Sequence, residues 1–395
     1  MEVDRLVIGK GLIGSAAAKY LSLAGDRVAI VGPDEPTDLR AATVFASHYD
    51  SGRVQRQIGR NDAMTALNLR SVEHYGWLRE QSGVSFHGGN GCLYVNPRGG
   101  DDYLSRAPGS AADRGVDATF YESAEELARA FPEFSFPDAA RGMFETSPSG
   151  YINPRRLIQA QLRIVERNGG TVVREVVERI DVSSEAVAVT TVSGRSFRAK
   201  SVLVTTGAFA NTLGLLPRKL ALIQKSETVL LAEVDRQEYQ RLEGLPSLLY
   251  EIDVPELEGI YSTAPLLYPD GRYYLKMGCN LPEDVFFDDD LQAIQTWFRE
   301  GRSDAQLPTL QAAMRAIMPG LKARGYISKR CVLPRTNGHG NPYIGSVGEG
   351  VHVAIGNGWS AMSSDGIGSV AAHLMLRGCF PDGFDSADFE PLFSS

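Results

Sequence analysis

The sequence predicts an α/β protein in which a domain with a parallel sheet is interleaved with an α+β domain built on a mixed or antiparallel sheet. An apolar run, a glycine-rich turn, a helix of small residues and a second apolar run fill the first 32 residues. No further strand–helix–strand units follow at that spacing, and strand and helix patterns then alternate irregularly. Because neither an internal repeat nor a low-complexity linker divides the chain, the two domains must interleave.

The composition is that of an ordinary globular protein. The chain has 395 residues, of which 43% are hydrophobic and 22% charged, so it can bury a large core and form about two or three domains. Its net charge of -8 argues against binding nucleic acid or an anionic membrane through overall charge. The four cysteines are far apart and form no C-x-x-C pair. This predicts neither a disulfide framework nor a zinc site and fits a reducing compartment.

Several locations and chemistries find no support in the sequence. A strand pattern begins at Val3, which leaves no room ahead of it for a signal peptide, and no apolar stretch approaches the roughly 18 residues of a membrane helix. We therefore expect a cytoplasmic protein. No H-E-x-x-H motif, P-loop or serine-histidine-aspartate arrangement is visible, so hydrolase and phosphoryl-transfer chemistry are not indicated. The six scattered histidines predict no metal site.

The first 32 residues form the pattern of a Rossmann-type nucleotide-binding unit. An apolar run over 6–8 precedes a G-x-G-x-x-G turn, a helix over 15–24 and a strand over 28–31. The first glycine allows the tight turn, the second lets the backbone approach a pyrophosphate, and the third lets the helix pack close to the sheet. The helix start then presents unpaired N–H groups to the phosphates. The predicted cofactor contacts are Gly9, Gly11, Leu12, Ile13 and Gly14. The alternative is a glycine turn that packs a helix and binds no ligand.

One position departs from the usual pattern of this unit. The residue that ends the second strand, where an acid normally holds the adenosine ribose, is Gly32. Asp34 and Glu35 are the nearest acids. We therefore predict that Asp34 takes the place of the missing acid.

The remaining elements follow from periodicity and from turn residues. Helical patterns occupy 62–78, 157–165, 290–299, 307–317 and a closing segment that follows Gly366-Ile367-Gly368 and ends at Leu376. Strand patterns occupy 171–173, 201–209, 228–232, 273–278 and 351–355, and residues 81–150 are rich in Gly, Pro and short alternating runs that suggest a second, sheet-based unit.

Six blocks of the chain, taken together in their order and spacing, resemble a known family. They are Gly9–Gly14, Ser47–Arg56, Thr206–Phe209, Leu275–Gly278, Cys331–Thr336 and Gly356–Gly368. The resemblance is to the flavin-dependent amine oxidases of the D-amino-acid oxidase superfamily, specifically the monomeric sarcosine oxidase branch, and it covers nearly the whole chain. It implies an FAD-binding domain made of 1–80, 151–218 and 328–395, a substrate domain made of 81–150 and 219–327, and a monomer.

The resemblance assigns roles to four charged or polar residues. Period two places Tyr274 and Lys276 on one face of a strand, where a lysine is usually solvated. The resemblance instead implies that Lys276 stands beside flavin N5 and favours reduction of oxygen. It places Arg53 near the flavin ring and Arg56 on the substrate carboxylate, the alternative being a surface pair of arginines. His48 then shapes the flavin pocket rather than acting as a base.

Further cofactor contacts are implied by the same blocks. The closing helix would point its N-terminal N–H groups at the flavin pyrimidine edge. Cys331 matches the position at which this branch attaches FAD covalently through the 8α-methyl group, whereas a free cysteine is most often a buried, inert residue. The other implied contacts are Ser47, Val177, Gly207, Gly356, Gly358 and Met362.

The substrate pocket departs from the sarcosine pattern at three positions. Met362 replaces a carboxylate-binding lysine, Asn280 replaces a histidine and Leu333 replaces a tyrosine. Anion recognition would then depend on Arg56, assisted by Arg335 or His339. Trp359 completes the predicted substrate contacts with Asn280 and Leu333.

The predicted reaction is oxidation of a secondary amine that carries a carboxylate. The substrate would lose a hydride to FAD, the imine would be hydrolysed, and molecular oxygen would become hydrogen peroxide. Iminodiacetate-like compounds, other N-substituted glycines and cyclic imino acids are the candidates. The alternatives are a dehydrogenase that passes electrons to a quinone or a carrier protein, and a tRNA-modifying or non-catalytic flavoprotein.

Overall fold

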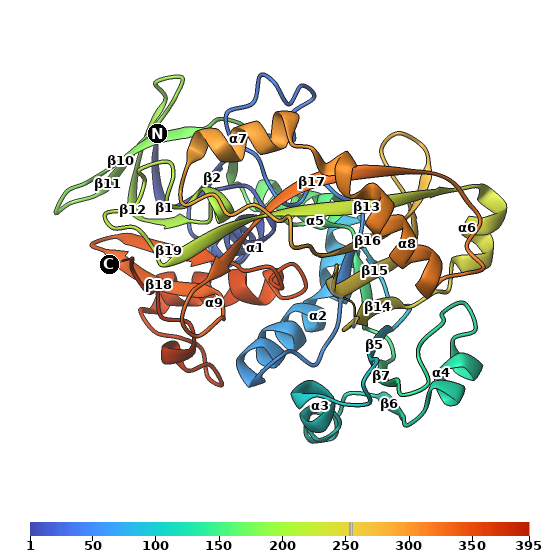
Figure 1. The fold of residues 1–395 in the computed structure, drawn as a ribbon. Coiled ribbons are helices and arrows are strands. Elements are labelled where there is room, and N and C mark those ends of the chain that lie inside the picture. Colours follow the sequence, from blue (N-terminus) through green and yellow to red (C-terminus); the bar gives the residue numbers. More distant parts are fainter. Residues whose placement is uncertain (253, 255, 395) are drawn as a thin grey trace.

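The computed structural model describes residues 1–395 except 253, 255 and 395. A first sheet lies on the left of Figure 1 and a second extends to the right. The first sheet has the order β10-β11-β12-β1-β2-β9, with β19 beside the second half of β12 and β18 beside β19. Its strands are β1 (Glu2–Ile8), β2 (Val28–Val31), β9 (Thr171–Val173), β10 (Val177–Val182), β11 (Val187–Thr191), β12 (Ser196–Val204), β18 (Tyr343–Gly348) and β19 (Val351–Ile355).

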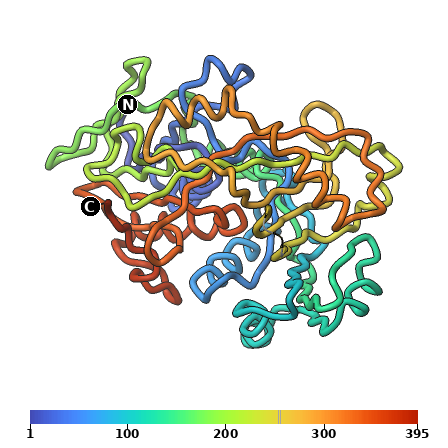
Figure 2. Tube along the Cα trace, viewed as in Figure 1, coloured from blue at the N-terminus to red at the C-terminus, as the bar shows by residue number. Residues whose placement is uncertain are grey.

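Four helices pack together beside the first sheet. They are α1 (Leu12–Leu23), α2 (Asp62–Ser82), α5 (Pro154–Arg167) and α9 (Ser364–Arg377). Ala16 and Ala17 of α1 are fully buried, and a Cβ on Gly368 of α9 would lie 2.5 Å from that of Ala16. Small residues therefore let α1 and α9 approach closely, although they lie at opposite ends of the chain (Figure 2). Asn61 caps the start of α2, and Gly83 ends this helix in the left-handed conformation.

A buried polar network joins three of these helices. The fully buried side chains of Lys19 in α1 and Asp365 in α9 form an ion pair of 2.5 Å. Tyr20 donates to the second oxygen of Asp365 at 2.6 Å, and Gln161 of α5 donates to the first at 3.0 Å. Buried charges are stable only when they are paired and hydrogen-bonded. The network therefore fixes how α1, α5 and α9 sit against one another.

The second sheet is mixed, as predicted. Its order is β17-β13-β16-β15-β14-β5-β7-β6, and among the described residues only the pair β14 and β5 is parallel. Its strands are β5 (Cys92–Asn96), β6 (Ala118–Tyr121), β7 (Arg141–Glu145), β13 (Leu222–Val234), β14 (Ser247–Tyr250), β15 (Glu258–Leu267), β16 (Tyr273–Asn280) and β17 (Ala323–Thr336). One face packs its own core, which includes Leu230, Leu275 and residues of α8 (Leu307–Ile317). Glu227 and Tyr261 of the other face line a cavity together with residues that follow β1, β12 and β19.

The origin of these strands bears on the predicted domains. The strands of the first sheet come from 1–80, 151–218 and 328–395, and those of the second from 81–150 and 219–327, except that β17 continues through residue 328 to Thr336. The predicted boundary thus falls inside a strand, and the domain division stays a prediction. Among the described residues, no helix is both long enough and apolar enough to cross a membrane.

Several short elements complete the chain. A small third sheet has the order β3-β8-β4, formed by β3 (Arg53–Gln55), β8 (Gly150–Ile152) and β4 (His87–Gly88). The remaining helices are α3 (Asp102–Asp113), α4 (Ala124–Ala130), α6 (Arg236–Leu242) and α7 (Leu291–Glu300), with 3₁₀ turns η1 (Gly207–Phe209), η2 (Ser303–Gln306) and η3 (Ser386–Asp388). The sequence patterns did not predict α3, α4 or α6. The sequence carries no helical signal for α3, because Pro108 lies inside it and proline disfavours a helix interior. Asp101 nevertheless caps the start of this helix.

Removing one partner of the buried ion pair should destabilise the fold. We expect Asp365→Asn to cost about 3–5 kcal/mol of unfolding free energy, because it leaves Lys19 buried and uncompensated. Urea unfolding checks this, with Glu125→Gln as the control. Glu125 pairs with Arg129 at 2.8 Å on the surface, so its loss should cost less than about 1 kcal/mol. Equal effects of the two substitutions would contradict the role of the network.

Candidate active site

Residues of both sheets line one cavity. The parallel strands β1, β12 and β19 end at it, and the residues that follow them, Gly9, Thr205 and Gly356, belong to its lining. Ligands bind outside the carboxyl ends of parallel strands in such sheets. The empty space amounts to about 1730 Å³, its open mouth included. The structure brings to this lining most of the predicted contacts: Gly9, Gly11, Leu12, Ile13, Ser47, His48, Arg53, Val177, Gly207, Cys331, Leu333, Gly356, Gly358, Trp359 and Met362.

The three glycines of the opening turn have different structural roles. Gly9 has a φ of +104°, and a Cβ there would lie 2.6 Å from the Thr205 carbonyl oxygen. A Cβ on Gly14 would lie 1.9 Å from the Gly9 carbonyl oxygen. Gly11 differs, because the nearest atom to its Cβ would be His48 Nδ1 at 3.8 Å. Gly9 and Gly14 are therefore required by packing, whereas Gly11 keeps space open beside the cavity. No side chain caps the start of α1, so its first N–H groups remain available to an anion.

Asp34 is placed differently from the glycines. It is not in the cavity lining but pairs with Lys10 and, at 3.0 Å, with Arg174. Its side chain is 57% exposed. Glu175 and Val176, which follow Arg174, line the cavity at this end. The contact of Asp34 with a ribose stays a prediction.

Lys276 is fully buried, which excludes the solvated strand lysine that the sequence left open. It forms an ion pair with Asp50 and donates to the Gly52 carbonyl at 2.8 Å. Burial lowers the pKa of Lys276 to about 8, and the charge of Arg53 adds to this effect, whereas Asp50 opposes it. Lys276 lies just behind the lining, with Nζ 5.2 Å from the ring centroid of Tyr261, which does line the cavity.

Asp50 holds this part of the site together. It accepts from Lys276 and from the Tyr268 hydroxyl, the latter at 2.7 Å, and Arg53 Nε lies 3.7 Å away. Burial raises the pKa of Asp50, but the charges of Lys276 and Arg53 outweigh this and hold it well below its usual value. Sequence reasoning assigned no role to Asp50. The only signal was its place within the Ser47–Arg56 block.

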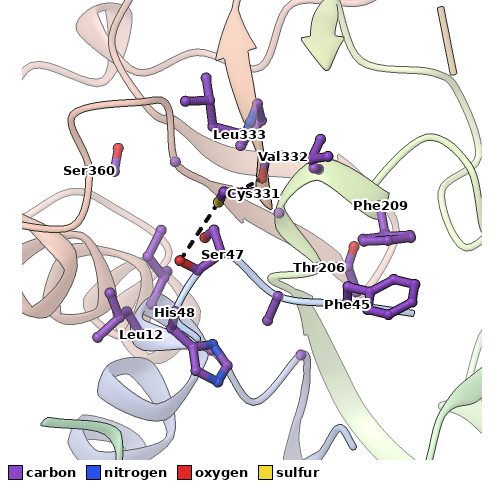
Figure 3. A pocket seen from close by; sticks show the side chains of 18 of the residues that line it. Leu12, Phe45, Ser47, His48, Thr206, Phe209, Cys331, Val332, Leu333 and Ser360 are labelled. Atoms are coloured by element: carbon purple, nitrogen blue, oxygen red, sulfur yellow. Dashed lines mark hydrogen bonds between the residues drawn. The ribbon is translucent and has the colours of Figure 1, made fainter. Parts of the chain in front are cut away.

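His48, Ser47 and Cys331 line the cavity, and Ser47 lies between the other two in Figure 3. Burial lowers the pKa of His48 to about 3, and Arg155 and Lys10 add to the effect, so the ring stays neutral near pH 7. This fits a wall residue rather than a base. Cys331 Sγ lies 3.9 Å from the Ser47 carbonyl oxygen. Burial raises the pKa of Cys331, and the charge of Arg53 opposes this.

The predicted substrate residues divide into two groups. Leu333 and Trp359 line the cavity, whereas Arg56, Asn280 and Arg335 do not. Arg56 is buried, its guanidinium carbon lies 5.8 Å from the Trp359 ring centroid, and its Nε and Nη1 make no hydrogen bond to the described residues. Arg335 donates to Asn280 at 3.1 Å. Buried donors without partners are costly, so Arg56 is the group here that is best prepared to receive an anion.

The closing glycines are placed differently from expectation. Gly366 and Gly368 lie inside α9 rather than before it. A Cβ on Gly366 would lie 2.3 Å from the Leu67 carbonyl oxygen of α2. These two glycines therefore serve helix packing, and Ser360–Met362, just before α9, are the residues that reach the cavity.

No sequence pattern indicated that Glu227 and Tyr261 belong to the site. Both belong to the lining, and the Tyr261 hydroxyl donates to Glu227 Oε1 at 3.0 Å. They belong to no recognisable motif. Their proximity arises from the pairing of strands that are distant in sequence.

Comparison with known proteins identifies the family. Residues 4–374 match the family of FAD dependent oxidoreductases known as DAO. The chain belongs to this family. The match confirms the resemblance drawn from the sequence and shows that the protein depends on FAD. The open space at Gly11 and the uncapped start of α1 fit this cofactor.

Individual relatives of this oxidoreductase are distant. The monomeric sarcosine oxidase of Arthrobacter sp. (strain TE1826) is 25% identical over 266 residues, which is 67% of this chain and 66% of that protein. The N-methyl-L-tryptophan oxidase of Yersinia pestis (strain Pestoides F) is 26% identical over 54% of this chain and 56% of its own length. The chain thus matches about two thirds and about half of these relatives.

Solved structures share the whole fold. NikD, an unusual amino acid oxidase essential for nikkomycin biosynthesis, superposes in its open form with a TM-score of 0.75 at 17% identity, covering 100% of this chain and 98% of that one. Iminodiacetate oxidase from Chelativorans sp. BNC1 has a TM-score of 0.67 at 22% identity, covering 98% and 99%. These likenesses confirm the predicted fold class.

The glycine turn allows a test that separates packing from cofactor binding. Gly11→Ala should fold normally but retain much less FAD, because the methyl group meets no protein atom and fills the space beside the phosphate site. Gly14→Ala should lower the melting temperature, because its Cβ clashes with Gly9. Flavin content and thermal melting check both. Gly76→Ala in α2, where a Cβ meets nothing within 4 Å, is the control. Normal flavin content in Gly11→Ala would contradict the assignment.

Proposed function

We propose that this oxidoreductase oxidises a secondary amine that carries a carboxylate and passes the electrons to molecular oxygen. The substrate class comprises N-substituted glycines, iminodiacetate-like compounds and cyclic imino acids. Bound FAD would accept the hydride and supply the redox chemistry. The observation that carries the proposal is the buried cation Lys276 behind the cavity wall.

Lys276 supports oxygen as the electron acceptor. A fixed positive charge in a low-dielectric site lowers the energy of superoxide as it forms from oxygen. Lys276 cannot move away, because Asp50 and the Gly52 carbonyl hold its ammonium group. A dehydrogenase that uses a quinone or a carrier protein would not need this buried cation.

Arg56 supports a substrate that carries a carboxylate. Its buried guanidinium has donors without partners and lies beside Trp359, which reaches the cavity. Met362 and Leu333 make the neighbouring wall apolar, which favours a substrate other than sarcosine itself. The names of the relatives, sarcosine, N-methyl-L-tryptophan and iminodiacetate oxidases, fit this class.

Mixing with amines in two stages tests the function. Anaerobic mixing with a panel of secondary amino acids should bleach the flavin absorbance of the holoenzyme, and admitting oxygen should restore it with release of hydrogen peroxide. Lys276→Met should be bleached normally but reoxidise about 100-fold or more slowly, because the charge that favours superoxide is lost. Lys200→Met, an exposed substitution on β12, is the control.

The pH dependence of reoxidation adds a second measurement. Because the pKa of Lys276 is lowered to about 8, its charge is present below this pH and lost above it. Reoxidation by oxygen should therefore slow as the pH rises through about 8, and this step should vanish in Lys276→Met. Unchanged oxygen consumption by Lys276→Met would remove the role of the lysine. If no amine bleaches the flavin, the alternative of a non-catalytic flavoprotein would be favoured.

We also propose that Cys331 carries FAD as a thioether. Cys331 lies in the cavity wall, where burial raises its pKa and the charges of Arg53 and Lys276 oppose this rise. After acid precipitation the yellow colour should stay with the polypeptide, and it should be released in Cys331→Ser. Cys279→Ser, a buried cysteine outside the lining, is the control. Release of all flavin from the wild-type protein would show that the cofactor is bound without a covalent bond.

A further inference from the structure

Glu227 on β13 is a buried carboxyl group in the cavity wall that none of the roles above employs. It is only 4% exposed, and both of its oxygens have partners. Oε1 accepts from the Tyr261 hydroxyl at 3.0 Å, and Oε2 accepts from Lys225 Nζ at 3.1 Å. Lys225 in turn forms an ion pair with Asp284. Each carboxylate oxygen can accept a second hydrogen bond, so a ligand in the cavity can still be bound.

The pairing of the second sheet places Glu227 where a ligand can meet it. On β17, Cys331 lies directly opposite Glu227. On the other side, Tyr261 of β15 reaches Glu227 by crossing Gly278 of β16, since a Cβ on Gly278 would lie only 2.2 Å from the Tyr261 hydroxyl oxygen. Lys276, two residues before Gly278, lies on the same face. Glu227, Tyr261 and Lys276 therefore belong to the face of the sheet that borders the cavity.

Burial and the charge of Lys225 shift the proton affinity of Glu227 in opposite directions. Burial raises the pKa of Glu227, and the ammonium group of Lys225 opposes this. A general base works best when its pKa approaches the working pH. The titratable and charged groups that face it from the surrounding elements are Lys225, Asp284, Tyr261, Cys279, Cys331 and Arg53.

Other titratable groups nearby are less suited to this exchange. Asp50 is occupied by Lys276, Tyr268 and Arg53, and it is not in the lining. His48 is surrounded by positive charges, and burial lowers its pKa to about 3. Within the described part of the chain, Glu175 is the other acid in the lining, and it is bound to Thr191 and Ser193.

We propose that Glu227 binds the ammonium group of the substrate and accepts its proton. This inference rests on the proposed function and names the base for that reaction. The proton moves from the ammonium nitrogen to a Glu227 oxygen, which leaves a neutral amine and a carboxylic acid, and no other bond changes. The nitrogen lone pair thus freed is what supports departure of a hydride from the adjacent carbon. The site then recognises a zwitterion, with Arg56 for the carboxylate and Glu227 for the ammonium group.

The first test is the pH dependence of flavin reduction in the holoenzyme. Glu227→Gln should slow anaerobic bleaching by the best amine of the panel about 100-fold at pH 7. The rate should approach that of the wild type as the pH nears the pKa of the free amine, since the neutral amine then enters directly. Glu233→Gln, on the same strand but paired with Arg272 outside the lining, is the control. A loss that is the same at every pH would overturn the proposal.

The second test measures binding and needs no turnover. The probes are 2-aminoisobutyrate, which has no α-hydrogen to lose, and isobutyrate, the same carboxylate without nitrogen. Titration calorimetry of the wild-type holoenzyme should show at least tenfold tighter binding of the amine. Glu227→Gln should abolish this preference and leave isobutyrate unchanged. If the wild type shows no preference, or if Glu227→Gln retains it, Glu227 is not the partner of the ammonium group, whatever reaction the enzyme catalyses.

If Glu227→Gln folds poorly, Tyr261→Phe offers an independent test of the role of Glu227. Its hydroxyl donates to the carboxylate and so favours the ionised form. Removing it raises the pKa of Glu227, and the acidic limb of flavin reduction should move to higher pH. Gly278→Ala should act in the same direction by displacing the tyrosine ring. An acidic limb that stays in place in both variants would overturn the proposal.

Discussion

The ion pair between Asp50 and Lys276 is the constraint on which the arrangement of the site depends. Lys276 belongs to the second sheet, whereas Asp50 belongs to the loop that leads from the first sheet to β3. A lysine buried without its partner would cost several kcal/mol, so the loop and the sheet must meet here. Gly52 permits the approach, since a Cβ there would lie 2.8 Å from Thr263 Oγ1. The distance between the loop and the sheet along the cavity is thereby set.

Two charged clusters, one around Lys276 and one around Glu227, lie on the same face of the second sheet and differ in their electrostatics. Around Lys276, the cation is held and its carboxylate partner is kept ionised. Around Glu227, the carboxyl group borders the cavity, and burial raises its pKa although Lys225 is close. Tyr261 lies between them, with its hydroxyl on Glu227 and its ring 5.2 Å from the Lys276 nitrogen. A fixed cation and an exchangeable proton can therefore coexist without cancelling each other.

The sequence predicted the elements with strong periodicity and the motif whose spacing has a local cause. The helix over 62–78 was predicted from its amphipathic pattern and the opening turn from its glycine spacing, because both signals act within a few positions. The burial of Lys276 could not be predicted, because β16 is buried on both faces and alternation carries no signal there. The Glu227–Tyr261 contact requires the register of three strands, β13, β16 and β15, which local pattern cannot supply. Asp34 illustrates the same limit, since its partners Lys10 and Arg174 are set by tertiary packing.

The apolar residues Met362 and Leu333 change how strongly the charged residues of the pocket act on a ligand. Met362 and Leu333 remove polar groups from the wall, which lowers the local dielectric and strengthens every remaining charge. If Arg56 binds the substrate carboxylate as proposed, that anion would need no second cation, provided that the opposite charge of the same ligand is also met within the site. Glu227 would meet that condition and Asp50 would not, because the charge of Asp50 is already paired with Lys276. A pocket with these proposed roles would discriminate in favour of zwitterions and against simple carboxylates, because a carboxylate alone would leave Glu227 buried without a cation from the ligand.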